Sequence, residues 1–462
     1  MLSPVERQVT EDKRLLFVTF DFPPRRTSGV YRMRSLAKYL SSCGWNPTVL
    51  TVRGPVALWD AGELIHDERL LEGLPPDIEI VRTGYLDLQA WEGIHPQHTL
   101  NRRPASSRSA EPIVAAKPSL VARIVLPSAR SIARIIRSIL YFPDRSAGWI
   151  PYALFAAIKL QRTHRFKAVF TSSPPRAALI VGMLFKFLFR VPWTADFMDP
   201  WYDPSGAIRR RSEKWLLRRI LRHADRVVVV TDGHAAALRE EFGADAHHIE
   251  VIANGFDEDN FRDLSETVPS VKPFVSMLHV GTIYPGFSGR FFDALTELIS
   301  ESPEIAMKVH IDIIGVVDSV TAEFSNSPLG QQVMTVHGYR PQTEALAAMF
   351  RTDYLLLFLA DEAFARQAVS GKMYEYLRVG RPILALTYPG GVQRLIDQSG
   401  SGLVLGPDDV ATMKDTLRRI IVERWTPQVE WREFADQFRY DRLAVKLARV
   451  LDDSGRPGQA RG

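Results

Sequence analysis

A chain of 462 residues is longer than one hydrophobic core usually supports, so we expect two domains. Its 46% hydrophobic and 24% charged residues are ordinary for a globular protein and exclude disorder over most of the length. The single cysteine, Cys43, excludes a disulfide framework and a cysteine-based metal cluster. A net charge of +5 suits an anionic partner, whether a nucleotide diphosphate, an anionic lipid or a nucleic acid.

The N-terminal segment, MLSPVERQVTEDKR, is polar and mixed in charge, and it lacks the apolar core of a secretory signal. The longest apolar stretch, Ala177 to Phe189, carries Lys186 and falls well short of the roughly 20 residues that a membrane span requires. These two features predict a cytoplasmic protein without an integral membrane segment.

The first elements of the chain predict a strand, a loop and a helix. Arg14 to Phe20 is a short apolar run that ends in a Pro-Pro turn, and Ser28-Gly29 opens the helical pattern of Val30 to Leu40. Pro47 to Val52 predicts the next strand, so the chain begins with the βαβ unit of a parallel, doubly wound sheet. Further strands are expected at Lys167 to Thr171, Trp193 to Phe197 and Arg226 to Thr231, with helices at Ala177 to Phe189 and Arg209 to His223.

A second α/β series follows in the rest of the chain. Its strands are expected at Phe274 to Val280, Val309 to Ile314, Met334 to His337, Tyr354 to Leu359 and Ile383 to Leu386. The polar stretch Asp257 to Lys272 is the best candidate for the linker between the two α/β series. We therefore predict two Rossmann-like domains that face a central cleft, at residues 1–262 and 263–425, followed at 426–462 by a helix that crosses back and a frayed tail.

Two segments of the first domain stand apart from this pattern. Residues 90–117 are rich in Pro, Ser, Ala and Arg without a clear period, which predicts a mobile inserted loop. Within residues 121–141, Arg130, Arg134 and Arg137 share one helical face opposite a row of isoleucines. We favour a core-facing helix with a solvated arginine side, and the alternative is a helix that lies on an anionic membrane surface. The basic helix at Arg209 to His223 has no accompanying aromatic stacking motif, so no nucleic-acid partner is expected.

Several motifs together resemble a known family. Seven segments carry the resemblance: DFPP, TSGVYRMRSLAKYL, SSPPRAALIVG, DFMDPW, VIANGFD, HVGTIYPG and SGKMYEYLRVGRPILA. Their order and spacing resemble glycosyltransferase family 4. The resemblance runs from Arg14 to about Ala385, except for residues 90–117. It implies a GT-B fold, a nucleoside-diphosphate sugar donor, hexosyl transfer with retention of anomeric configuration, and no obligatory metal or other cofactor.

The departing diphosphate of such a donor needs positive charge and amide donors, because negative charge builds on it as the glycosidic bond breaks. Gly371-Lys372, preceded by Ser370, begins a predicted helix and is our candidate diphosphate site. Glu375, one turn later, matches the second glutamate of the family's paired-glutamate motif and would accept hydrogen bonds from the donor ribose. Gln367 takes the place of the first glutamate.

Three further segments are expected to contact the donor. Gly281 and Thr282 follow a strand at the carboxyl edge of the second sheet, where ligands of such sheets bind. The family commonly has an arginine where this chain has Thr282, and Arg290 aligns only loosely with the second basic residue of that motif. The loop of Tyr339 and Arg340 matches the one whose backbone meets the nucleobase, and Ser28 and Gly29 should face the cleft from the first domain.

The candidate catalytic residues besides Lys372 are Asp196 and Asp199, at the end of a first-domain strand. Both can look into the cleft, where one would orient the acceptor hydroxyl or act as a base. The alternative for Asp199 is a turn cap before Pro200. Met198 stands where the family often has arginine, and SSPP occupies the place where a first-domain histidine would be sought.

The sequence thus predicts a glycosyltransferase that acts on a glycan, lipid-linked or small-molecule acceptor in polysaccharide or glycoconjugate biosynthesis. It would work in the cytoplasm, with peripheral contact to the inner face of the membrane through residues 121–141 as an open alternative. Two other functions remain open: an epimerase or hydrolase of sugar nucleotides with the same fold, and a non-catalytic sugar-nucleotide-binding subunit. The second is motivated by Gln367, Thr282 and the missing histidine.

Overall fold

The computed structural model describes residues 13–27, 29–54, 67–86, 142–200, 207–243, 248–264, 272–359, 361–427 and 431–455. Ser28, the predicted insertion at 90–117 and the basic segment at 121–141 lie outside these residues. Within the described part, no helix is long and apolar enough to cross a membrane.

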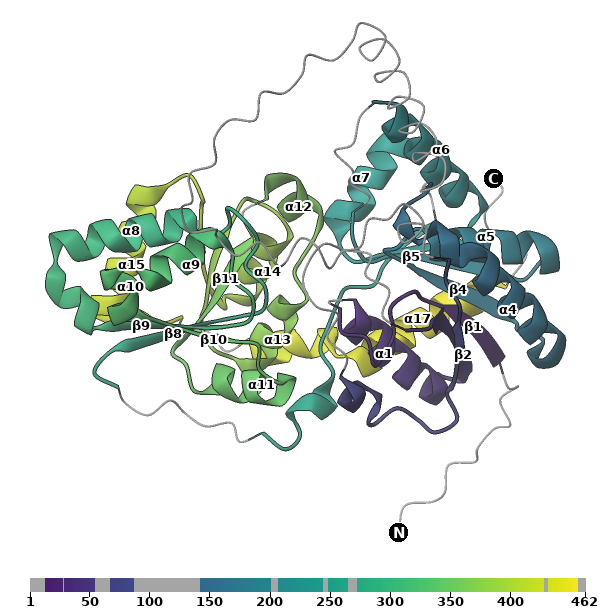
Figure 1. The fold of residues 1–462 in the computed structure, drawn as a ribbon, viewed down its shortest axis with the longest axis horizontal. Coiled ribbons are helices and arrows are strands. Elements are labelled where there is room, and N and C mark those ends of the chain that lie inside the picture. Colours follow the sequence, from purple (N-terminus) through teal and green to yellow (C-terminus); the bar gives the residue numbers. More distant parts are fainter. Residues whose placement is uncertain are drawn as a thin grey trace, which may run out of the picture.

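The N-terminal domain is built on a parallel sheet whose described strands run in the order β3-β2-β1-β4-β5-β6-β7 (Figure 1). The strands are β1 (Lys13–Val18), β2 (Trp45–Val52), β3 (Glu79–Thr83), β4 (Ala168–Ser173), β5 (Trp193–Phe197), β6 (Arg226–Val229) and β7 (Ile249–Val251). The strand order reverses direction between β1 and β4, which opens a crevice beyond their carboxyl ends.

Helices cover both faces of this sheet. They are α1 (Val30–Leu40), α4 (Ile150–His164), α5 (Ala177–Phe189), α6 (Ala207–His223) and α7 (Asp232–Phe242), with short 3-10 turns η1 (Ser41–Cys43), η2 (Glu68–Leu71) and η4 (Arg145–Trp149). Because side chains alternate along a strand, those of β1 pack into two hydrophobic cores, one on each face of the sheet. Leu15 and Phe17 pack on the side of α1, and Leu16 and Val18 pack on the side of α4 and α5.

The C-terminal domain repeats this plan with the described strand order β10-β9-β8-β11-β12-β13. The strands are β8 (Val275–Val280), β9 (Val309–Ile314), β10 (Met334–Gly338), β11 (Tyr354–Leu359), β12 (Ile383–Thr387) and β13 (Gly402–Leu405). The helices are α8 (Gly289–Glu301), α9 (Ser319–Asn326), α10 (Pro328–Val333), α11 (Gln342–Phe350), α12 (Glu362–Gln367), α13 (Lys372–Val379), α14 (Gly391–Ser399) and α15 (Val410–Glu423), with 3-10 turn η7 (Pro303–Met307). The core on one face includes α8 and α15, and the core on the other includes α11 and α13. The two parallel sheets with their covering helices form two Rossmann-like domains, as predicted.

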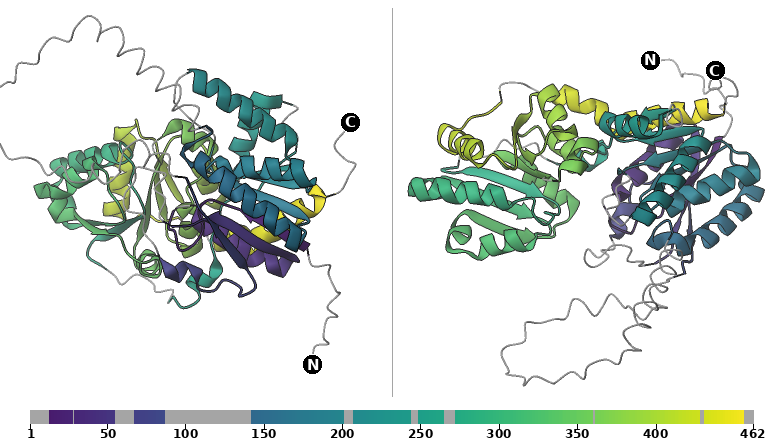
Figure 2. Two further views of the ribbon diagram at one scale, coloured as in Figure 1. Left: turned by 45° about the vertical axis from the view of Figure 1, so that its right-hand side comes forward. Right: turned by 90° about the horizontal axis from the view of Figure 1, so that it is seen from above.

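The C-terminal segment returns to the first domain through α16 (Arg432–Ala435), η8 (Asp436–Phe438) and α17 (Tyr440–Ser454). Figures 1 and 2 show α17, in yellow, along the N-terminal domain, where it contacts α1. Leu443, Leu447 and Leu451 of α17 enter the same core as α1. Gly255 makes the crossing possible, because a Cβ at that position would collide with the carbonyl of Phe438.

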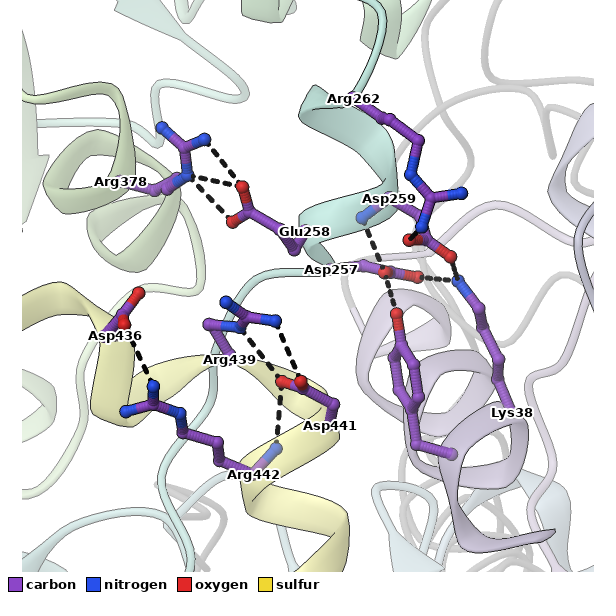
Figure 3. Close-up of polar contacts among 11 residues, drawn as sticks. Lys38, Asp257, Glu258, Asp259, Arg262, Arg378, Asp436, Arg439, Asp441 and Arg442 are labelled. Atoms are coloured by element: carbon purple, nitrogen blue, oxygen red, sulfur yellow. Dashed lines mark hydrogen bonds and ion pairs between the residues drawn. The ribbon is translucent and has the colours of Figure 1, made fainter. Parts of the chain in front are cut away.

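The link between the domains is acidic. Asp257 precedes η6 (Glu258–Phe261), and we call Asp257, Glu258 and Asp259 the acidic linker. Lys38 of α1 donates to Asp257 and Asp259 at 2.8 and 2.6 Å, and Arg378 of α13 donates to Glu258 (Figure 3). The linker therefore binds one helix of each domain.

The carboxyl edges of the two sheets face each other. Arg26, in the loop after β1, lies over the ring of Tyr339, in the loop after β10. Thr231, after β6, donates its hydroxyl hydrogen to the backbone carbonyl of Gln367, at the end of α12. We refer to the space between these two edges as the cleft.

Candidate functional site

The start of α13 is fixed at the point where the C-terminal strand order reverses. The hydroxyl of Tyr376 donates to the Leu356 carbonyl of β11 at 3.1 Å and accepts from the Val280 amide of β8 at 3.0 Å. One side chain of α13 thus binds both strands that flank the crevice. Gly371 precedes the helix, and a Cβ built on it would meet nothing within 4 Å, so the space over the helix start is open.

Lys372, the first residue of α13, lies against a buried histidine that is not among the predicted site residues. Its Nζ is 3.4 Å from Nε2 of His279, whose Nδ1 lies 3.0 Å from the Leu356 carbonyl. The carbonyl assigns the ring proton to Nδ1, which leaves Nε2 as the acceptor for the ammonium. Burial, reinforced by the charge of Lys372, holds the pKa of His279 well below its usual value, so the ring is neutral.

The ammonium of Lys372 is partly desolvated. Burial lowers the pKa of Lys372 to about 8, and the carboxylate of Glu375 opposes this shift. Its position also depends on Gly281, the residue after β8. Gly281 has a φ of +114°, and a Cβ there would lie 2.7 Å from the Lys372 Nζ. The positive φ therefore favours glycine at 281, and a Cβ there would displace the end of the Lys372 side chain.

Glu375 faces the same region one turn along α13. Gln342, the first residue of α11, donates from Nε2 to Glu375 Oε1 at 3.0 Å. Burial raises the pKa of Glu375 to about 7, while Gln342 and Lys372 oppose the shift. A cation, a carboxylate and an amide thus converge on the open start of α13, and Ser370 and Thr282 are half-buried at its margin.

The structure does not bring every predicted donor residue to this point. Arg290 is 64% exposed, and its guanidinium lies 3.9 Å from Asp293 of its own helix. Gln367 is half-buried at the domain boundary, where its carbonyl accepts from Thr231. Arg340 is exposed and borders a cavity of about 460 Å³ between α11 and strands β8 to β10, which Lys372 and Glu375 do not line.

The two aspartates of the first domain have different environments. Asp196 is fully buried, accepting from Arg32 Nη2 at 2.9 Å and from Ser172 Oγ at 2.7 Å. It does not look into the cleft, which corrects the expectation for the pair, because strand alternation turns it inward toward α1. Arg32 also donates to the carbonyls of Ile252 and Ala253, so this group fastens α1 to the segment that leads into the linker.

Asp199 does reach the cleft. Its side chain retains contact with solvent, but the surrounding protein raises its pKa to about 6, and the charge of Asp196 adds to the shift. The charge of Asp199 in turn helps raise the pKa of Tyr284, in the loop after β8, so these two loops face each other across the cleft. Gly29 lies nearby, since a Cβ on it would stand 2.6 Å from Cε of Met198.

A buried histidine also lies at this edge of the first domain. His234, in the first turn of α7, packs edge-on against Phe197 with the ring centroids 6.4 Å apart. Burial lowers its pKa to about 4, so the ring is neutral. The family motif places a first-domain histidine at SSPP, which lies elsewhere in the sequence. His234 was therefore not predicted.

Comparison with known proteins relates this chain to glycosyltransferases. Residues 29–255 match the family model of the glycosyl transferase 4-like domain. The 2-deoxystreptamine glucosyltransferase of Streptomyces kanamyceticus is 24% identical over 293 residues, which cover 59% of this chain and 73% of that protein.

Solved structures share the whole architecture. Anabaena HepE in complex with UDP has a TM-score of 0.59 at 14% identity, over 95% of this chain and 99% of that one. TarM has a TM-score of 0.60 at 8% identity, over 95% and 99% of the two chains. Sucrose-phosphate synthase from Thermosynechococcus elongatus has a TM-score of 0.57 at 14% identity, over 95% and 98%. At such low identity these likenesses show the fold alone.

Proposed function

This chain is a glycosyltransferase with a family-4-like first domain in a GT-B fold, and we propose that it transfers a sugar from a nucleoside-diphosphate donor to a hydroxyl group with retention of anomeric configuration. The observation that carries the donor proposal is the partly desolvated Lys372 at the open start of α13, held by His279 and Gly281. A structural neighbour, HepE, has been solved with UDP and glucose, which supports a donor of this class.

The diphosphate would lie over the first turn of α13. The amides of Met373 and Tyr374 already donate to the carbonyls of Ser370 and Gly371. The dipole of α13 adds positive potential at the helix start. Lys372 contributes a partly desolvated charge, whose effect on the departing phosphates is larger than that of a fully solvated one. In this proposal the chain itself, rather than a metal ion, stabilises the leaving group.

The nucleoside would extend from there toward Glu375 and the loop of Tyr339. Glu375, held by Gln342, would accept hydrogen bonds from the ribose hydroxyls, and the backbone of residues 338–340 would meet the base. Asp199, ionised above a pKa of about 6, is the first-domain carboxylate placed to orient the acceptor hydroxyl or take its proton. Asp196 would act only by holding α1 through Arg32.

The acceptor is proposed to be a glycan, a lipid-linked molecule or a small molecule, in the synthesis of a polysaccharide or glycoconjugate. The small-molecule class has a precedent in the Streptomyces relative, whose name gives 2-deoxystreptamine as the molecule it glucosylates. Product analysis by NMR would establish the acceptor, the linkage and the retained configuration. Release of free or epimerised sugar without an acceptor would favour an epimerase or hydrolase instead.

The donor site is tested by calorimetry with UDP, GDP, ADP and CDP, on the wild type and on Lys372→Ala and Glu375→Ala. We expect one nucleotide to bind and both variants to lose at least about ten-fold in affinity, as for the loss of one charge-assisted contact. Lys446→Ala, on the exposed face of α17, is the control and should bind as the wild type does. Unchanged affinity in both site variants would reject the site, and binding without turnover would support a non-catalytic subunit.

A further inference from the structure

The closest described stacking contact between the two domains joins a charged side chain to an aromatic ring. The guanidinium carbon of Arg26 lies 3.8 Å from the ring centroid of Tyr339. This is well inside the range of a favourable cation–π contact, about 6 Å, and guanidinium groups stack readily on aromatic faces. Arg26 belongs to the first domain, whereas Tyr339 belongs to the loop that we assign to the nucleobase.

Asp21 binds the residues before and after Arg26 and so fixes the loop that carries it. The carboxylate of Asp21 accepts from Arg25 Nε at 2.9 Å and from Thr27 Oγ1 at 3.2 Å. Asp21 and Arg25 are buried, so this bracket is shielded from water. Arg26 is therefore presented toward the second domain from a fixed turn rather than from a free loop.

A second side chain of the first domain, Tyr31, lies next to Arg26. Arg26 Nε lies 3.4 Å from the hydroxyl of Tyr31, which is half-buried in the first turn of α1. Burial raises the pKa of Tyr31, Arg26 opposes this shift, and the charge of Glu375 adds to it. The Tyr31 hydroxyl is therefore within electrostatic reach of Glu375, the carboxylate that would hold the ribose.

We propose that Arg26 and Tyr31 close the nucleoside part of the donor site from the first domain, with Arg26 packed against the Tyr339 loop and Tyr31 beside the ribose held by Glu375. This rests on the proposed function and adds two residues to it. Both would donate hydrogen bonds to the nucleoside, and neither would act on the leaving phosphates. The Arg26–Tyr339 contact joins the two halves of the site directly, which lowers the ordering cost of binding.

The test measures binding of UDP, GDP, ADP and CDP to the full-length protein by calorimetry, with thermal unfolding as a check that each variant folds. Arg26→Ala should bind the preferred nucleotide about ten-fold more weakly, as for the loss of one charge-assisted hydrogen bond to the nucleoside. Arg26→Lys keeps the charge without the planar group and should recover only part of this loss. Arg162→Ala, exposed on α4, is the matched control and should bind as the wild type does.

A double-mutant cycle tests the pair itself. Tyr339→Phe keeps the ring and should bind normally, whereas Tyr339→Leu should weaken binding as Arg26→Ala does. Adding Arg26→Ala to Tyr339→Leu should cost little more, because both changes remove the same contact. Tyr31→Phe should weaken binding of the nucleotide less than Arg26→Ala, since it removes one hydroxyl.

The outcomes separate this inference from the function on which it rests. If Lys372→Ala loses nucleotide binding while Arg26→Ala binds as tightly as the wild type, the donor site stands and the closing pair is wrong. Tighter binding by Arg26→Ala would also overturn it, because Arg26 would then occupy the place of the base. If none of the four nucleotides binds the wild type, both proposals fail.

Discussion

Glu258 and Arg378 form a bidentate ion pair that joins the acidic linker to the helix carrying Lys372 (Figure 3). Arg378 donates from Nε to Oε2 at 2.8 Å and from Nη2 to Oε1 at 2.6 Å. The preceding residue, Asp257, accepts from Lys38 of α1 at 2.8 Å. Consecutive linker residues therefore hold the last turns of α1 and α13, the two helices whose first residues flank the cleft. The linker consequently helps set the distance between the two walls of the proposed donor site.

Breaking that ion pair should affect activity more than folding. Arg378→Ala frees one end of α13, so we expect kcat/KM for the donor to fall several-fold while stability falls by about 1 kcal/mol, as for a partly exposed pair. Urea unfolding and steady-state kinetics measure the two effects. Arg442→Ala is the matched control, because Arg442 pairs with Asp436 at 3.0 Å on the exposed side of the same region. Equal kinetic losses in both variants would contradict a role for the linker in setting the cleft.

Donor binding should have a pH optimum between the pKa of Glu375 and the pKa of Lys372, two residues of α13. Lys372, with a pKa of about 8, attracts the diphosphate only when protonated, so affinity falls as pH rises through 8. Glu375, with a pKa of about 7, accepts ribose hydrogen bonds best when ionised, so affinity falls as pH drops through 7. Nucleotide affinity measured from acidic to alkaline pH should show both limbs. Lys372→Arg should remove the alkaline limb and Glu375→Gln the acidic one, and an unchanged profile in either would contradict its assignment.

The interior strands could be predicted from the sequence, and among the described edge strands β10 was predicted as well. The predicted bounds of β5, β9 and β11 match the structure. β5 and β11 are buried at every position, and β11 is a continuous apolar run. β3, β7 and β13 were not predicted, because edge strands are short or partly polar, as in the half-exposed EIVRT of β3.

The same limit applies to the site. Lys372 and Glu375 share one helix start, a pattern that is local in sequence. The partners that hold them, His279 and Gln342, come from β8 and α11, and only strand order and register bring them close. His279 did carry a signal, as a polar residue near the end of an apolar strand before Gly281. Strand alternation turns Asp196 inward, but its ion-pair partner Arg32 lies far away in the sequence and could not be predicted.

Gly281→Ala should remove donor binding by displacing Lys372. The new methyl group would stand at the 2.7 Å position next to Nζ, and a φ of +114° would strain the backbone. Gly286→Ala separates these two effects, because Gly286 has a φ of +85° in the same loop but open space around its Cβ position. Both variants should lose about 1 kcal/mol or more of stability from backbone strain. Only Gly281→Ala should lose nucleotide affinity in calorimetry, and normal binding by this variant would contradict the contact between Gly281 and Lys372.

Asp196 and Asp199 should give opposite results when each is replaced. Asp196→Ala leaves the guanidinium of Arg32 buried without its carboxylate, so we expect a loss of about 3–5 kcal/mol of stability in urea unfolding. Asp199→Asn should fold as well as the wild type at neutral pH. The raised pKa of Asp199, about 6, means that the folded protein favours its neutral form, which the amide imitates.

Turnover completes the contrast between the two aspartates. In the wild type, activity should fall as pH drops through about 6, where Asp199 becomes protonated. Asp199→Asn should bind the nucleotide normally and turn over slowly at every pH, by about 100-fold if the carboxylate takes a proton. Single-turnover measurement with the identified donor and acceptor separates that step from binding. Full activity in Asp199→Asn would leave the acceptor hydroxyl without its proposed partner and would assign the acidic limb to Glu375 alone.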